Sequence, residues 1–130
     1  MNYVAIVTVL ALLEFWWLGA LVGRARGKYQ IAAPAITGHE IFERQFRVHM
    51  NTLEQLIVFL PAMWMFGSYF DDRWAAGLGL VFIAGRAVYA KSYVRDPKSR
   101  SLGFAMSSIP TIILLVGTLF GAVRALIAVE

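Results

Sequence analysis

Long apolar runs alternate with short polar segments along the whole chain. A helix needs about 20 mostly apolar residues to cross the roughly 30 Å hydrocarbon core of a bilayer. Four stretches reach that length: residues 3–22, 46–70, 74–93 and 102–127. The pattern therefore predicts an all-α integral membrane protein, with a single domain over residues 1–130 made of four transmembrane helices.

The polar segments between these runs predict how the helices are connected. The segment 23–38 carries three basic residues, a proline and glycines, and we expect it to be a loop. The Asp71-Asp72-Arg73 sequence predicts a tight turn, so the second and third spans should form an antiparallel hairpin. Pro97 lacks a backbone donor and predicts a break before the fourth span. No basic segment precedes the first apolar run, which argues against a cleaved signal peptide.

Composition and charge support a membrane location. The chain is 59% hydrophobic and 15% charged, with a mean hydropathy of +0.65, too apolar for a small soluble domain. Its net charge is +4, but the basic residues flank apolar runs, which favours a membrane over nucleic acid as the partner. Basic residues concentrate in the first and third connections, which predicts cytoplasmic loops and both termini on the other side. The minimal loops favour a bacterial inner membrane.

The absence of cysteine narrows the possible chemistry. With no cysteine in the sequence, disulfides, a protein thiolate nucleophile and cysteine-ligated metals are all excluded. His39 and His49 are too isolated to predict a metal site. Any thiol chemistry must therefore come with a substrate, and no metal is expected.

Two polar stripes inside the predicted spans are the main candidate site. Arg47, Asn51 and Glu54 are spaced by four and three residues, so they share one face of the second helix. Arg86, Tyr89 and Tyr93 share a face of the third helix in the same way. Charged residues within a span normally face a bundle interior, a cavity or one another. Together the two stripes would form a cationic pocket for a small polyanion, because arginine pairs bidentately with carboxylates.

Structural roles are open for the same residues. Arg47 and Glu54 could be an ion pair that fixes helix packing, and Tyr93 could be an interfacial anchor. Glu14, in the middle of the first span, is interpreted as a packing residue that pairs with a neighbouring helix.

The stripe on the second span lies within a recognisable motif. Glu43-Arg44, Arg47, Asn51 and Glu54 follow the spacing of a signature in the MAPEG superfamily, the membrane-associated proteins in eicosanoid and glutathione metabolism. The segment Arg24 to Tyr29 and the later series of Arg86, Tyr89, Tyr93 and Arg100 are similar as well. The resemblance covers essentially the whole chain, including its length and number of spans.

The resemblance implies a left-handed four-helix bundle that assembles as a homotrimer and binds glutathione between subunits. By position, the glutathione-binding residues would be Arg26 (from the adjacent subunit), Arg47, His49, Asn51, Glu54, Arg86, Tyr89 and Tyr93. Arg100 matches the arginine that would stabilise the glutathione thiolate. The chemistry fits, since a cation lowers a thiol pKa from its reference value of about 8.5, and the thiolate is the nucleophile.

The expected activity is a membrane-bound glutathione transferase that conjugates glutathione to apolar electrophiles or, as a peroxidase, reduces lipid hydroperoxides. Gln55 replaces the tyrosine of the leukotriene synthase branch, and Gly27 replaces a second arginine of that branch, which argues against leukotriene synthesis itself. The alternatives are a non-catalytic lipid-binding or scaffold protein of the same fold and, less favoured, a small transporter that uses the intramembrane charges as a relay.

Overall fold

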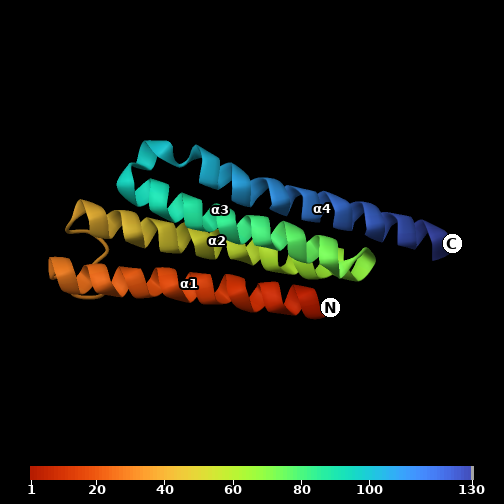
Figure 1. Ribbon diagram of the computed structural model, residues 1–130, viewed down its shortest axis with the longest axis horizontal. Helices are drawn as coiled ribbons and strands as arrows, with labels where there is room; N and C mark the ends of the chain where they lie inside the picture. Colours follow the sequence, from red (N-terminus) through yellow and green to blue (C-terminus); the bar gives the residue numbers. More distant parts are fainter. Residues whose placement is uncertain (130) are drawn as a thin grey trace.

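The computed structural model describes residues 1–129, and these form a bundle of four long helices (Figure 1). The helices are α1 (Asn2–Tyr29), α2 (Glu40–Tyr69), α3 (Asp72–Arg95) and α4 (Ser101–Val129), with a short 3₁₀ helix, η1 (Pro97–Ser99), before α4. No strand occurs in this part of the chain. The α1–α2 and α3–α4 connections lie at one end of the bundle, and the α2–α3 turn lies with both termini at the other (Figure 1). The prediction of an all-α fold is confirmed.

Two of the helical segments have the length and composition of membrane spans. Asn2–Tyr29 and Pro97–Val129 contain windows with mean hydropathy of 2.1 and 2.4. Only 22% and 11% of the residues in these windows are buried within the chain, whereas the core helix of a soluble bundle would be mostly buried. The exposed side chains include Trp16 (75%) and Leu126 (65%). An apolar surface of this extent requires a non-aqueous environment or a protein partner.

The expectation of a loop over residues 23–38 is wrong for its first part. The α1 helix continues through Tyr29, and only then does Gln30 adopt the left-handed conformation, with φ of 55°. The amide of Ile31 donates to the Arg26 carbonyl at 3.0 Å and closes the helix end. Arginine and lysine are good helix formers. Arg26 and Lys28 also lie in the last turn, where their positive charges interact favourably with the negative end of the helix dipole. The glycines there lower helix propensity without ending the helix.

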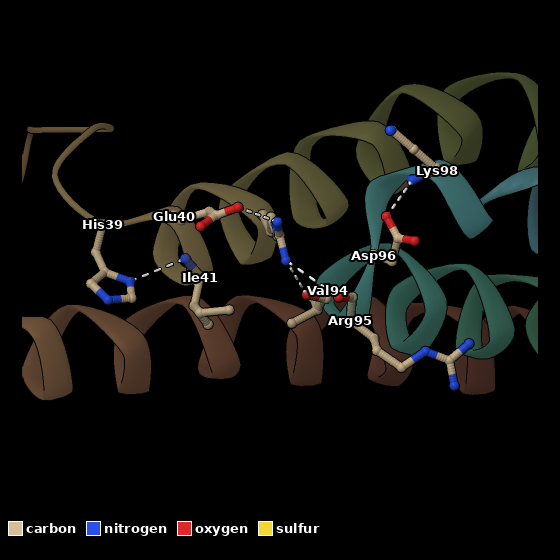
Figure 2. A network of polar contacts seen from close by, with 8 residues as sticks. His39, Glu40, Ile41, Val94, Arg95, Asp96 and Lys98 are labelled. Atoms are coloured by element: carbon tan, nitrogen blue, oxygen red, sulfur yellow. Dashed lines mark hydrogen bonds and ion pairs between the residues drawn. The ribbon is translucent and has the colours of Figure 1, made fainter.

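Polar side chains cap the starts of α2, α3 and η1, and the sequence predicts the last two of these positions. The Asp71 carboxylate accepts from the Arg73 amide at 2.9 Å and starts α3 directly after α2, which confirms the hairpin. The Asp96 carboxylate accepts from the Lys98 amide at 3.1 Å and starts η1, which confirms the break at Pro97 (Figure 2). At the start of α2, His39 Nδ1 accepts from the Ile41 amide at 3.1 Å (Figure 2).

One arginine connects the basic ends of α2 and α3. Arg44 pairs with Glu40, one turn earlier on α2, and donates to the carbonyl oxygen of Val94 at 3.0 Å. Figure 2 shows Glu40 and Val94 on the two sides of this contact. The Arg44 side chain thus donates to a carbonyl oxygen that has no helical partner in the last turn of α3. This contact holds the two helices in register at the end where the polar stripes lie.

The main apolar core lies toward the other end of the bundle. Phe59 of α2 and Phe82 of α3 stack with ring centroids 3.8 Å apart, and Met63 and Leu114 pack with them, all without solvent exposure. This core orders the helices, so the polar residues at the basic end are positioned by elements that are already packed.

Candidate active site

A pocket of about 170 Å³ opens where α2, α3 and the start of α4 meet at the basic end. Four of the residues that the sequence predicts for the site line it, together with one further aromatic side chain: Arg47, Asn51, Tyr89, Arg100 and Phe104. The two helix stripes therefore face one space, and the segment before α4 adds Arg100 to it.

Arg86 lies behind this pocket rather than in its wall. Its side chain is completely buried, and its guanidinium donates to Asn51 Oδ1 at 2.7 Å and to Thr52 Oγ1 at 2.9 Å. It also donates to Ser107 Oγ at 3.2 Å and lies over the Tyr89 ring, 4.3 Å from the centroid. Because Arg86 takes the Asn51 oxygen, the Asn51 amide NH₂ stays available as a donor to a ligand.

Two glycines bring α3 and α4 close enough to form the pocket. A Cβ on Gly103 would lie 2.3 Å from the Tyr89 backbone nitrogen, and one on Gly85 would lie 2.7 Å from the Ser107 nitrogen. No other residue fits these two positions without moving the helices apart. Gly103 is one turn from Arg100, so this contact sets the distance between Arg100 and Tyr89 across the pocket.

Two further predicted residues extend the site outward. Glu54 forms an ion pair with Arg47, with 3.4 Å between Oε1 and Nη2, and both side chains are more than half exposed. Tyr93 stacks on Tyr89 with ring centroids 5.5 Å apart. The ion pair that the sequence left open as a packing device is thus present, but it lies at the surface beside the pocket.

Two of the predicted residues lie away from this pocket. Arg26 donates to the Ala35 carbonyl at 2.7 Å and lies over the Phe42 ring at 4.8 Å. His49 stacks on Phe15 of α1, with centroids 4.4 Å apart. Both belong to the α1 side of the bundle, so a single chain does not bring them to the ligand that Arg47 and Arg100 would contact.

Glu14 does not have the partner that the sequence predicts. Within residues 1–129 it makes no hydrogen bond or ion pair, and it lines a groove between α1 and α3 instead.

Three residues that shape the site are not among those predicted from the sequence: Thr52 and Ser107, whose hydroxyls bind Arg86, and Gly103, which contacts the Tyr89 backbone. The spacing of Arg100, Gly103 and Ser107 is three and four residues, which is the helical signal that could have identified two of them.

The pocket offers hydrogen-bond donors and positive charge to a small anion. Arg47 and Arg100 supply guanidinium groups, Asn51 supplies an amide and Tyr89 a hydroxyl. Within residues 1–129 there is no cluster of three or more histidine or acidic side chains that could hold a metal ion. Guanidinium and amide donors are suited to carboxylates.

A sequence model of the MAPEG family matches residues 4–120, which includes every residue of this pocket. The chain belongs to the MAPEG family. The resemblance inferred from the α2 motif is therefore confirmed. Membership in this family, together with the two long apolar helices, indicates a membrane protein.

The proteins that are similar in sequence to this chain include two kinds of enzyme. Human microsomal glutathione S-transferase 2 is 39% identical over 116 residues, covering 88% of this chain and 79% of the relative. Leukotriene C4 synthase of Cavia porcellus is 35% identical over 96 residues, covering 74% and 64%. An uncharacterised protein of the cyanobacterium Synechocystis is 48% identical over 115 residues, covering 88% and 84%.

Proposed function

We propose that this MAPEG protein is a glutathione transferase that conjugates glutathione to apolar electrophiles. The pocket supports this, because glutathione carries two carboxylates and an ammonium group. Arg47 and the Asn51 amide would bind carboxylate, and Glu54 would bind the ammonium. The similarity to microsomal glutathione S-transferase 2 supports the same substrate.

Arg100 is the residue proposed to activate the thiol. It lines the pocket together with Tyr89 and is exposed, with no acidic partner among residues 1–129. A guanidinium next to the glutathione sulfur favours the thiolate. The thiolate then attacks the electrophile, and the leaving group departs with the electron pair. With a hydroperoxide, the thiolate would attack the terminal oxygen, the O–O bond would break and the alkoxide would leave as the alcohol, which gives glutathione sulfenic acid. A second glutathione would then react with the sulfenic acid to yield the disulfide and water.

The single observation that carries the proposal is the joint presence of Arg47, Asn51, Tyr89 and Arg100 in one pocket. The test is glutathione binding and thiolate ultraviolet absorbance of the purified protein in detergent. Arg100→Ala should retain glutathione binding and lose most of the thiolate signal and conjugation of an aryl halide. Arg47→Ala should instead weaken binding about tenfold to a hundredfold, the effect of losing a charge-assisted contact.

Lys98→Ala serves as the control, since this cation lies two residues before Arg100 but does not line the pocket. Wild-type protein that binds glutathione without thiolate formation or conjugation would contradict the transferase proposal. It would favour the non-catalytic lipid-binding alternative, which the exposed apolar helices of the bundle also support. Protein that does not bind glutathione would contradict the site itself.

We further propose that all four helices span the membrane and that the chain forms a homotrimer. The 24 residues of α3, the shortest, extend about 36 Å, more than the hydrocarbon core requires. In the trimer, Arg26 and His49 would contribute to the pocket of the adjacent subunit. Mixing Arg26→Ala and Arg47→Ala subunits should then restore normal glutathione sites in a fraction of the interfaces, as measured by titration; no restoration would contradict the shared site.

The proposed orientation places the basic end of the bundle in the cytoplasm of a bacterial cell. The natural sequence has no cysteine, so single cysteines can report the two ends. A cysteine at Lys98 should resist an impermeant maleimide applied to spheroplasts, and a cysteine at Arg73 should react. The opposite pattern would reverse the orientation.

A further inference from the structure

A groove between α1 and α3 lies on the opposite side of α3 from the active-site pocket. Its larger part, about 470 Å³, is lined by Trp17, Leu18, Leu21, Ala87 and Val94, and Glu14 lies at the end farther from the basic end of the bundle. A smaller hollow of about 170 Å³ continues it toward the basic end. The two share Leu21 and Gln45, so they form one continuous surface, here called the α1–α3 groove.

Four cations line the basic end of the α1–α3 groove. Arg24 and Lys28 come from α1, and Lys91 and Arg95 come from α3. All four are exposed, and none forms an ion pair within residues 1–129. Figure 2 shows the Arg95 side chain directed away from Glu40 and Asp96. This end of the groove therefore has concentrated positive charge that the chain itself does not neutralise.

The remaining wall of the groove is apolar. From Arg24 to Glu14 the α1 helix advances about 15 Å, and the side chains between them in the groove are Trp17, Leu18 and Leu21. On the α3 side, Ala87 and Ala90 have small side chains that leave room for a ligand. A small soluble anion would not use this apolar wall, while a neutral lipid would not use the cations.

We propose that the α1–α3 groove binds a phospholipid with a net negative headgroup. The phosphate would contact the four cations at the basic end, and one acyl chain would lie along the apolar wall as far as Glu14. Lysine and arginine at a membrane surface attract anionic lipids in this way. A zwitterionic headgroup fits less well, because its own ammonium would meet the same four cations. The proposal does not depend on glutathione binding.

Trp17 provides a direct test, because it lines the groove. Purified protein in neutral detergent is titrated with phosphatidylglycerol or phosphatidylcholine, each carrying brominated acyl chains that quench tryptophan. Quenching by the anionic lipid should occur at concentrations at least tenfold lower, and Trp17→Phe should remove that component. Inorganic phosphate at equal concentration should not compete. Equal quenching by both lipids, or competition by phosphate alone, would overturn the proposal.

Two matched pairs of variants locate the site. Lys91→Gln should weaken anionic-lipid quenching about fivefold, and Lys98→Gln, a lysine outside the groove, should leave it unchanged. Ala87→Leu should fill the groove and abolish the quenching of Trp17, while Ala84→Leu, exposed on the same helix but outside the groove, should not. Equal effects within either pair would overturn the assignment of the lipid to this groove.

Discussion

The candidate active-site pocket and the α1–α3 groove lie on opposite sides of α3 and use basic residues in different ways. Behind the pocket, the buried Arg86 donates to Asn51, Thr52 and Ser107 and lies over the Tyr89 ring, so Asn51 and Tyr89 are fixed before any ligand arrives. In the groove, Lys91 and Arg95 are exposed and have no acidic partner within residues 1–129. Fixed donors suit one small ligand of defined shape, whereas exposed cations without an acidic partner suit headgroups that vary in position.

The pocket and the α1–α3 groove should respond separately to substitution. Each variant is therefore measured for glutathione affinity and for quenching by anionic lipid. Lys91→Gln should leave glutathione affinity within about twofold of wild type, because the residue does not line the pocket.

Arg86→Met should have the largest effect, and only on the pocket. The substitution removes the donor from the buried oxygens of Thr52 and Ser107 and from the partly buried oxygen of Asn51, and the loss at each buried oxygen costs about 1–3 kcal/mol. We expect a lower melting temperature in detergent and a loss of glutathione affinity of at least tenfold. The exposed Arg124→Met is the control. Unchanged glutathione affinity would show that Asn51 needs no orientation by Arg86.

Gly103→Ala should have the next largest effect. The new methyl group would lie 2.3 Å from the Tyr89 nitrogen, so α4 must move away from α3, at a cost of about 1–3 kcal/mol. Arg100 would move with it, and thiolate formation should fall more than glutathione binding. Gly77→Ala, on the same bundle but with open space around it, should be neutral or slightly stabilising. Equal melting temperatures for the two variants would contradict the close contact.

The sequence predicted the helices more completely than the site. Hydropathy, Asp71 and Pro97 specify where three of the helices begin or end, because these signals are local. The end of α1 was missed, since helix-forming basic residues continue past the apolar run and no breaker occurs before Gln30. Helix periodicity likewise predicted that Arg47 and Asn51 share a face.

Contacts between helices could not be predicted in the same way. The burial of Arg86 depends on Thr52 and Ser107, which lie 34 and 21 residues away along the chain. The importance of Gly103 depends on which backbone faces it. The absence of a partner for Glu14 within residues 1–129 depends on the space left between α1 and α3. Such features follow from packing and not from the spacing of residues in one helix.

Glu54→Gln should have the smallest effect on stability, and it tests a contact at the edge of the pocket. Glu54 and Arg47 form an exposed ion pair, a type of contact worth about 0–1 kcal/mol, so this part of the site resembles the groove more than it resembles Arg86. The melting temperature should therefore stay close to that of wild type. Glutathione affinity should fall several-fold, because the glutathione ammonium would lose a carboxylate.

N-acetylated glutathione, which has no ammonium group, separates this role from a general disturbance of the pocket. Wild type and Glu54→Gln should bind this analogue with the same affinity, while glutathione itself distinguishes them in an isothermal titration. Gln55→Glu, which alters the charge at the next position, should not reproduce the pattern, because residue 55 does not line the pocket. An equal loss of affinity for both ligands would mean that Glu54 acts only by holding Arg47.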